Sequence, residues 1–356
     1  MTVLETAFVT GFPGFIASRL VKRLARTDRR FFLLVQPSFV ERARAELEQI
    51  AASSDKPASD FQILEGDITA PGLGLSALEL ELARMEATTV FHLAAIYDLA
   101  VARDVAMRVN VSGTQNVNDF ARSLKNLRHY HYISTCYVAG KRESRILETE
   151  LRHDAGFRNH YEETKHLAEL EVEALKDELP ITVHRPSVVC GDSQTGETAK
   201  YDGVYYLIHY LRKWPGLLSS FNIGNDAVSL NLVPVDFVVD AIAALATDAR
   251  AIGKTIQLAD PHPLSTHDLF DTIARELTGH GSRLTIPASL VQFTLMLPPS
   301  PRITELPHHA VPYFFLKQTY DTRLALQLLT PFGVTCPPFQ TYARQIIDYA
   351  AGHPVR

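Results

Sequence analysis

Short apolar runs alternate with longer amphipathic segments along the first half of the chain. The run Phe31–Val35, five apolar residues in succession, is typical of a strand buried on both faces of a sheet. Strands that alternate with helices predict a parallel sheet with helices on both sides. The expected strands are Thr6–Thr10, Phe31–Val35, Gln62–Glu65, Thr89–Leu93, His129–Ser134 and Ile181–Arg185, and the expected helices are Phe15–Ala25, Val40–Ala51, Leu75–Glu81, Ala102–Leu124 and Tyr161–Glu178.

The pattern changes after Arg185. Residues 191–200 are rich in Gly, Ser, Thr and Asp and predict a loop, an aromatic stretch follows at 201–214, and Pro is dense at 287–312. We therefore expect an α/β protein: residues 1–190 form a doubly wound parallel sheet to which 228–260 return. Residues 191–227 and 261–356 form a smaller C-terminal substrate-binding lobe, in which the apolar stretch Ile286–Pro301 shapes a lid.

Composition excludes several classes of protein. The 356 residues are 46% hydrophobic and 21% charged, which is too apolar for a disordered chain. The formal net charge of −5 gives no basic surplus for nucleic acid or an anionic membrane. No run reaches the roughly 18 apolar residues of a membrane span, and the three cysteines have no metal-ligand spacing. We expect a cytoplasmic protein, monomer or homodimer, without a metal.

A glycine-bearing turn joins the first strand to the first helix. It reads Thr10-Gly11-Phe12-Pro13-Gly14-Phe15-Ile16-Ala17, a GxxGxxA pattern. Gly11 permits the tight turn, Gly14 lets the backbone approach a pyrophosphate, and Ala17 allows close packing of helix on strand. Because the N-terminus of the helix offers free N–H groups, the pattern predicts a dinucleotide site in a Rossmann fold.

The second strand ends at Gln36, without the acid that usually binds the ribose of NAD. Arg42 and Arg44 follow on the next helix, and a guanidinium can pair with a 2′-phosphate. NADPH is therefore expected, and NADH is disfavoured. Further contacts with the cofactor are expected where later strands end, at Asp67, Ile68, Leu93, Ala94 and Ala95.

Tyr161 and Lys165 are spaced as YxxxK at the start of a helix, so they share one helix face. A nearby ammonium lowers the pKa of a phenol, and Tyr161 could then exchange a proton with a carbonyl oxygen. Thr135 ends a strand at the edge where parallel sheets bind ligands. It is the better candidate for a hydroxyl that bonds the substrate oxygen, and Ser134 is the lesser one.

These motifs together resemble the extended short-chain dehydrogenase/reductase superfamily. The matching stretches are 10–17, 66–67, 92–95, Asn110–Val117, Ser134-Thr135, Tyr161/Lys165 and Arg185-Pro186-Ser187. The resemblance implies a catalytic triad of Thr135, Tyr161 and Lys165, with Asn110 as a fourth catalytic residue. It also implies that Tyr161, Lys165, Pro186, Ser187 and Val188 contact the cofactor.

Within that superfamily, the chain is most similar to the thioester reductases and fatty acyl-CoA reductases, the male sterility branch. The stretches 157–165, 191–196 and 233–238 carry this likeness. Arg44 falls where the branch has a phosphate-binding arginine, whereas Gln36 replaces the arginine that usually closes the second strand.

The leading hypothesis is an NADPH-dependent oxidoreductase that transfers hydride to the carbonyl of an apolar substrate, with Tyr161 as proton donor. The substrate is an acyl thioester, on coenzyme A or a carrier protein, or an aldehyde or ketone. Expected substrate contacts are Tyr97, Cys136, Tyr201 and Tyr205. Two alternatives stay open: a nucleotide-sugar epimerase with tightly held NAD, and a non-catalytic NADP-binding regulator. A dehydratase is disfavoured because Cys136-Tyr137 stand where its Asp-Glu pair follows the catalytic Thr.

Overall fold

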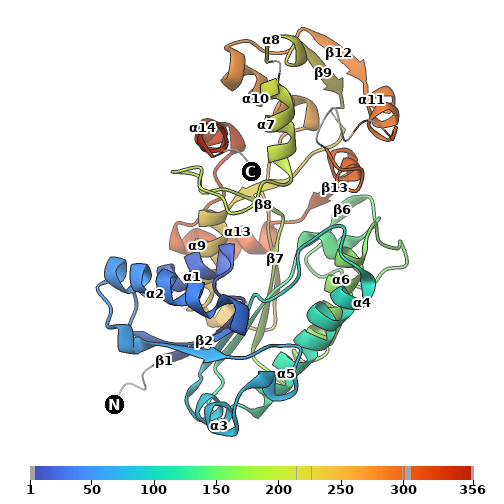
Figure 1. Ribbon diagram of the computed structural model, residues 1–356. Helices are drawn as coiled ribbons and strands as arrows, with labels where there is room; N and C mark the ends of the chain where they lie inside the picture. The colour runs from blue at the N-terminus through green and yellow to red at the C-terminus, as the bar shows by residue number, and fades with distance from the viewer. Residues whose placement is uncertain (1–4, 214, 226, 299, 301–305, 354–356) are drawn as a thin grey trace.

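The computed structural model describes residues 5–213, 215–225, 227–298, 300 and 306–353. At its centre lies a seven-stranded sheet in the order β11-β7-β5-β4-β1-β2-β3, and every neighbouring pair is parallel (Figure 1). The strands are β1 (Glu5–Thr10), β2 (Arg29–Val35), β3 (Phe61–Glu65), β4 (Thr89–His92), β5 (His129–Ile133), β7 (Ile181–Pro186) and β11 (Thr255–Leu258).

Helices cover both faces of this sheet, as the continuous apolar strands predict. Alternate strand residues enter different cores: Ala7 and Val9 pack in one, and Phe8 packs in the other. The first core is closed by α1 (Phe15–Leu24), α2 (Val40–Ser54) and α9 (Val235–Leu245). The second is closed by α3 (Ala77–Glu86), α5 (Gly113–Ser123) and α6 (His160–Glu173). The doubly wound α/β fold is confirmed.

The expected strands and helices agree with the structure to within five residues at each end, except in one helix, and β11 was not expected as a strand. The stretch expected as a single helix from 102 to 124 is α4 (Arg103–Ala106), a π-helical segment (Met107–Ser112) and then α5. The wider turn contains Asn110, whose buried amide bonds backbone groups of a different segment. A tertiary contact therefore widens the helix, which periodicity alone does not reveal.

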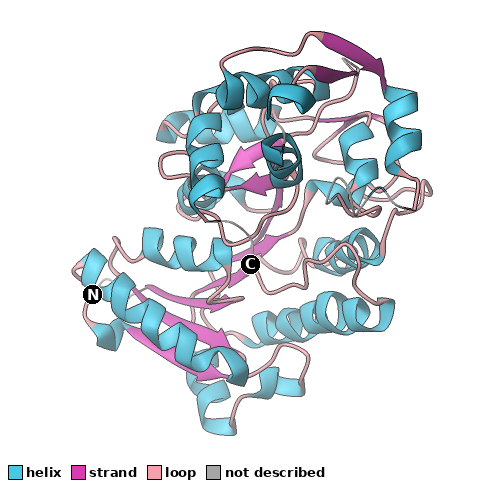
Figure 2. Ribbon diagram, turned by 45° about the horizontal axis from the view of Figure 1, so that its top comes forward, coloured by secondary structure: helices cyan, strands magenta, loops and turns pink. Residues whose placement is uncertain are grey.

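The remaining elements form a second, smaller part that lies above the sheet in Figure 1 and is rich in short helices in Figure 2. Its core is aromatic and includes Tyr205, Phe270, Tyr313, Phe314 and Tyr342. Its elements include β8 (Val188–Cys190), α7 (Val204–Lys213), α8 (Pro215–Leu218), β9 (Phe221–Gly224), β10 (Leu232–Pro234), α10 (Thr266–Thr278), β12 (Leu284–Pro287), α11 (Ala288–Leu295), the 3₁₀ turn η7 (Val311–Phe315) and α14 (Ala343–Gly352).

Two late segments return toward the central sheet. Residues 228–260 supply α9, which packs with α1, and β11, which pairs with β7. Helix α13 (Arg323–Leu329) also packs against this core, although the sequence placed it in the lobe. The strand that precedes it, β13 (Gln318–Tyr320), pairs with β6 (Ser144–Ile146) and so brings this stretch of chain back to the sheet. The residue limits of the two parts otherwise stay a prediction.

Candidate active site

The turn after β1 forms a backbone cradle. Gly11 has a φ of +88°, and a Cβ there would lie 2.7 Å from the backbone nitrogen of Ala94. A Cβ on Gly14 would lie 2.6 Å from the carbonyl oxygen of Gly11. No side chain caps α1, and its first turn has no acidic residue. The first N–H groups of the helix are therefore available to an anion.

Two adjoining hollows run from this cradle along the carboxyl edge of the sheet, with volumes of about 480 and 300 Å³. Both are lined by Gly11, Gly14, Ala94 and Ala95, so they form one continuous channel. An extended dinucleotide with its phosphates at the cradle fits this shape. The cofactor residues expected from the sequence that line the channel are Thr10, Gly11, Phe12, Pro13, Gly14, Phe15, Ile16, Gln36, Ile68, Leu93, Ala94, Ala95, Tyr161, Lys165, Pro186, Ser187 and Val188.

Two of the expected cofactor residues lie beside the channel rather than on its wall. Asp67 accepts a hydrogen bond from Gln36 Nε2 at 3.0 Å and one from the Thr69 amide. Arg44 is 64% exposed and bonds Glu41 on its own helix at 3.3 Å. Arg42 lines the channel instead, next to Gln36. The structure thus brings one of the two α2 arginines to the hollow.

The catalytic candidates meet where β5 ends. Thr135 follows this strand, and Asn159 caps the N-terminus of α6 and so places Tyr161 in the first turn of that helix. The Tyr161 phenol is buried and lines the same wall of the channel as Thr135. Burial raises the pKa of Tyr161, the Thr135 side chain lowers it, and the nearby Asp202 and Glu162 raise it further. The sequence argument expected Lys165 to lower this pKa. In the structure, Lys165 is not among the groups that shift this pKa, because its amine bonds Tyr132 and Ile133 instead, and burial is the dominant effect.

Lys165 lines the same channel, and its amine bonds residues at the end of β5. Its Nζ donates to Tyr132 Oη at 3.0 Å and to the carbonyl oxygen of Ile133 at 2.8 Å. Burial lowers the pKa of Lys165 to about 7, and the nearby Glu169 opposes that shift. The amine is therefore held by the end of β5 and titrates near neutral pH.

Asn110 is buried behind the channel and bridges two segments. Its Oδ1 accepts from the Ile96 amide at 2.8 Å, and its Nδ2 donates to the Ile96 carbonyl oxygen and to Thr164 Oγ1. Ile96 precedes Tyr97, whose ring stands edge-on to that of Tyr161 with centroids 5.0 Å apart. Asn110 thus ties the loop that carries Tyr97 to the helix that carries Tyr161.

Among the expected substrate contacts, Tyr97 lines the channel, whereas the other three do not. Cys136 is buried, and its Sγ donates to the Arg185 carbonyl oxygen at 3.2 Å. Tyr205 is buried with its hydroxyl oxygen accepting from the Gly191 amide at 2.9 Å. Tyr201 packs edge-on against Tyr205. The structure does not bring these three side chains to the crevice.

Four residues at the mouth of the channel escaped the sequence argument: Tyr137, Thr198, Lys200 and Asp202. Lys200 Nζ donates to the Tyr97 carbonyl oxygen at 2.6 Å and lies 3.9 Å from the centre of the Tyr97 ring. It also pairs with Asp202 at 3.4 Å. The loop composition at 191–200 was a signal that this region carries function, but it did not single out these side chains.

A buried ion pair supports the catalytic edge from behind. Arg185 Nε donates to Glu169 Oε1 at 2.8 Å, and both side chains are at most 2% exposed. Ser134 Oγ donates to the other carboxylate oxygen. The Ser134 hydroxyl is thus used to bond Glu169, while its neighbour Thr135 lines the channel with Tyr161. This geometry favours Thr135 over Ser134 as the hydroxyl that faces a substrate.

A family model described as "Male sterility protein" matches residues 9–242, which is more than half of the chain. The chain belongs to this family. The match covers the cradle, the channel and both Tyr161 and Lys165, and it bears out the resemblance to NAD-binding extended short-chain dehydrogenases/reductases of the thioester reductase branch. This family is a reductase-type, NAD(P)-binding one, and the site of this chain is interpreted accordingly.

Curated relatives of this male sterility protein include two reductases. Fatty acyl-CoA reductase wat of Drosophila melanogaster is 26% identical over 278 residues, 68% of this chain and 54% of the relative. Glycine betaine reductase ATRR of Emericella nidulans is 27% identical over 295 residues, 77% of this chain and 22% of the relative. The chain therefore spans about half or less of the length of these relatives.

Solved structures support the fold. The terminal R domain from the myxalamid PKS-NRPS biosynthetic pathway is 23% identical and has a TM-score of 0.80, covering 99% of this chain and 92% of that domain. UDP-glucuronic acid 4-epimerase from Bacillus cereus, in complex with NAD, is 21% identical with a TM-score of 0.65, covering 97% of this chain and 96% of that one. At these identities, both establish shared architecture alone.

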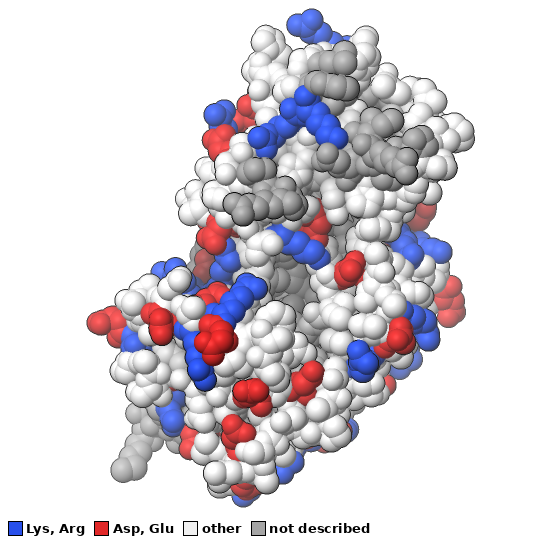
Figure 3. Space-filling view, viewed as in Figure 1, with Lys and Arg blue, Asp and Glu red and all other residues white. Residues whose placement is uncertain are grey.

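Three further observations concern partners and metals. In the part of the chain that the structure describes, no helix has the length and apolar character to cross a membrane. Figure 3 shows acidic and basic side chains interspersed over the lower part of one face, without a continuous basic surface there. Among the described residues, no group of three His, Cys, Asp or Glu is placed to hold a metal ion.

Proposed function

We propose that this male sterility protein is an NADPH-dependent reductase of acyl thioesters, carried on coenzyme A or on a carrier protein. The observation that carries the proposal is that Tyr161 and Thr135 line the same hollow as Gly11 and Gly14 of the phosphate cradle. The curated relatives named as fatty acyl-CoA reductases favour a thioester over a simple ketone.

The cradle at Gly11 and Gly14 and the N-terminus of α1 would hold the pyrophosphate, and Lys165 and Pro186–Val188, which line the same hollow, would hold the nicotinamide. When bound, NADPH supplies the hydride. Thr135 and Tyr161 hold the carbonyl oxygen of the substrate, and Tyr161 gives that oxygen its proton as negative charge develops on it. The raised pKa of Tyr161 keeps the phenol protonated at neutral pH, which is the form that a proton donor needs.

After the carbon–hydrogen bond has formed and the oxygen has been protonated, the tetrahedral product is a hemithioacetal. Breaking its carbon–sulfur bond releases a thiol and an aldehyde. The reaction therefore consumes one NADPH and one proton per thiol released. A second turnover on the aldehyde would give an alcohol. The stoichiometry of NADPH to thiol separates the two outcomes.

The experiment that tests the proposal follows NADPH consumption and thiol release together. The panel is a medium-chain acyl-CoA, the corresponding aldehyde and a bulky ketone, with NADH run in parallel. Thiol release that keeps pace with NADPH consumption supports the thioester reductase. Turnover of only the aldehyde or ketone would contradict it and indicate a carbonyl reductase. Purified protein that holds NAD tightly and consumes no NADPH would favour the epimerase.

The role of Tyr161 gives a sharper prediction. Replacement of Tyr161 by Phe removes the proton donor, and general acid catalysis is worth about 10²- to 10⁴-fold. We expect kcat to fall by about that factor while the Kd for NADPH, measured by fluorescence titration, changes less than about threefold. Tyr349→Phe is the matched control, since Tyr349 stacks on His353 in the C-terminal helix, away from the channel. A Tyr161→Phe enzyme that keeps most of its rate would rule out this donor.

A further inference from the structure

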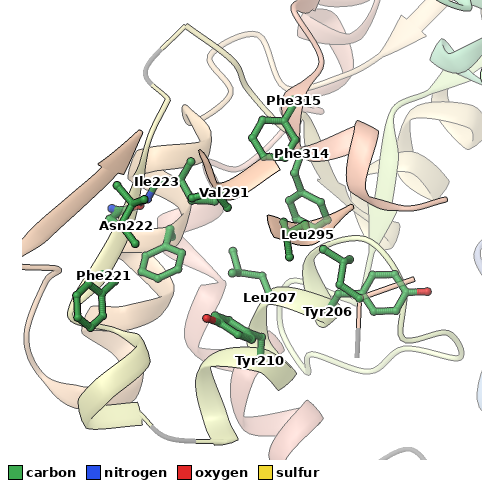
Figure 4. A pocket seen from close by; sticks show the side chains of 13 residues that line it. Tyr206, Leu207, Tyr210, Phe221, Asn222, Ile223, Val291, Leu295, Phe314 and Phe315 are labelled. Carbon is green, nitrogen blue, oxygen red and sulfur yellow. The ribbon is translucent and has the colours of Figure 1, made fainter. Parts of the chain in front are cut away.

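A charged hollow of about 610 Å³ lies apart from the catalytic channel and shares no lining residue with it. It differs in character from the pocket of about 120 Å³ in Figure 4, whose wall of side chains such as Leu207 and Val291 carries no charge. The volume of the charged hollow falls in the range of small-molecule sites, about 300–1,000 Å³. Its lining contains five basic and three acidic residues: Arg142, Arg152, Lys176, Arg185, Lys254, Glu148, Glu150 and Glu173.

The three acids of this hollow already have donors. Glu148 is buried and accepts from two backbone amides at 3.0 Å each. Glu150 accepts from another amide at 2.9 Å and pairs with Arg142 at 3.3 Å. Glu173 pairs with Lys176 at 2.7 Å. Because all three carboxylates are engaged, the hollow offers little to a metal ion or another cation.

The basic side chains, in contrast, are only partly matched. Arg152 and Lys254 are exposed, and within the described residues their side chains make no hydrogen bond or ion pair. The Nη2 atom of Arg142 is buried and has no hydrogen-bond partner among the described residues. A buried donor without a partner is costly, and a bound water or ligand commonly satisfies it. The hollow therefore has positive charge and hydrogen-bond donors to spare.

The remaining basic side chains form a rigid floor. Arg142, Lys176 and Arg185 are at most 16% exposed. Arg185 is held by its ion pair with Glu169 and by donation from its Nη1 to the Glu150 carbonyl oxygen at 3.0 Å. Groups that are already fixed lose little conformational freedom when a ligand binds. The floor is thus preorganised, and Arg152 and Lys254 add unpaired charge to the hollow.

We infer that this hollow binds a small oxyanion with two or more negative charges, either a phosphate compound or a polycarboxylate. Guanidinium groups pair with both kinds of oxyanion through parallel N–H donors, and Arg142 and Arg152 supply two such groups. A monocarboxylate can neutralise only one of the two unpaired cations, so affinity should depend on the number of charges on the ligand. No residue of the hollow lines the channel, so the inference does not depend on the reaction performed there.

Calorimetry with inorganic phosphate, pyrophosphate and citrate tests the site, with acetate at the same ionic strength as the monovalent probe. Saturating NADPH is present throughout, because the free cradle at Gly11 and Gly14 would otherwise bind phosphate as well. At least one polyvalent probe should bind at least tenfold more tightly than acetate. Preference for phosphate and pyrophosphate identifies the phosphate class, and preference for citrate identifies the polycarboxylates.

Two substitutions locate the bound anion. Arg152→Ala and Lys254→Ala should each weaken binding of the polyvalent probe about tenfold or more, the loss expected for one charge-assisted contact. Both side chains are exposed, so neither substitution should disturb folding. Arg26→Ala and Lys22→Ala are the matched controls, since both residues are exposed and line neither this hollow nor the channel. They should leave the Kd within about twofold of the wild-type value.

Three results would overturn the inference. The first is no binding of any polyvalent probe at millimolar concentration, and the second is equal affinity for acetate and the polyvalent probes. The third is a Kd for the polyvalent probe that is the same in Arg152→Ala and Lys254→Ala as in wild type, because the anion would then lie elsewhere.

Discussion

At the scale of single residues, Arg42 and Arg44 stand two positions apart on α2 and so point to nearly opposite sides of the helix. Arg42 lines the channel beside Gln36. Arg44 is exposed and paired with Glu41. The family resemblance assigned the 2′-phosphate to Arg44, whereas the geometry favours Arg42 for that contact. The 2′-phosphate is the group that distinguishes NADPH from NADH, so this residue is a test of cofactor choice.

Arg42→Ala should raise the Kd for NADPH about tenfold or more, because a charge-assisted hydrogen bond contributes about 1.5–3 kcal/mol. The Kd for NADH should stay within about twofold. Arg44→Ala, the matched control on the same helix, should change either Kd by less than about threefold. Fluorescence titration of both cofactors against both variants measures this. A loss of NADPH affinity in Arg44→Ala, with Arg42→Ala close to wild type, would restore the assignment to Arg44.

The sequence predicted that Tyr161 and Thr135 lie at the same site, because both residues occupy local motifs at element ends, and the structure places both on one wall. The sequence could not predict which way Cys136 points. Cys136 follows Thr135 directly, but the chain enters a 3₁₀ turn (Cys136–Ala139) there, and the sulfur goes to the Arg185 carbonyl oxygen. The sequence also could not predict the role of Lys200, because its partner Tyr97 is 103 residues away in the chain and only the fold brings the two together.

At the scale of elements, strands β5 and β7 carry three buried histidines in contact. His131 Nδ1 and His184 Nε2 are 3.0 Å apart, and the rings of His129 and His131 have centroids 3.8 Å apart. Burial lowers the pKa of His129 to about 4 and that of His184 to about 3, and it lowers the pKa of His131 as well. The folded sheet therefore holds these rings neutral at neutral pH.

This cluster predicts acid sensitivity. An unfolded histidine titrates at about 6.5, so the unfolded chain binds more protons than the folded one below that pH. The free energy of unfolding should therefore fall as pH drops below about 6.5 and keep falling to about pH 4. Each excess proton contributes about 1.4 kcal/mol per pH unit. Urea unfolding between pH 7.5 and 5 measures the slope.

His131→Leu should reduce that slope by up to about 1.4 kcal/mol per pH unit, because it removes one of the buried titrating rings. His280→Leu removes a histidine from the exposed surface and serves as the control. A slope that is the same in His131→Leu as in wild type would show that the acid sensitivity originates elsewhere.

At the scale of the whole molecule, most of the sheet was predictable and the smaller part was not. Six of the seven strands were expected from the sequence, and their pairing follows from the order of βα units. The seventh, β11, was not expected as a strand, because it is short, carries the polar residues Thr255 and Gln257, and follows the long excursion into the smaller part. In the smaller part, β9 and β12 are four residues each and pair across some 60 residues of chain, so the order of elements along the sequence does not indicate their pairing.

One tyrosine joins the two parts at the catalytic helix. Tyr313 Oη donates to Glu162 Oε1 at 2.6 Å and accepts from Asn159 Nδ2 at 2.7 Å. Tyr313→Phe should lower the free energy of unfolding by about 1–3 kcal/mol, since it leaves the buried Glu162 carboxylate short of a partner. It should also raise KM for the acyl substrate severalfold, with the Kd for NADPH unchanged.

Tyr320→Phe is the control for that prediction, because its hydroxyl bonds Gln318 within the same short strand. It should cost some stability, as urea unfolding would show, and leave KM as in wild type. If both variants raise KM alike, the rise in KM reflects a general loss of stability and does not depend on the hydrogen bonds of Tyr313 between the two parts.

The double grip of Asn110 on Ile96 has a practical consequence. It fastens the Tyr97 loop and the Tyr161 helix into one unit, and the smaller part adds contacts of its own, since Lys200 donates to the Tyr97 carbonyl oxygen and Tyr161 packs in the aromatic core. A substitution in the smaller part can therefore reach the reacting groups through Lys200 or Tyr313. An engineer who alters that part has to check that Tyr161 keeps its place, whereas a change beyond these two residues leaves the unit intact.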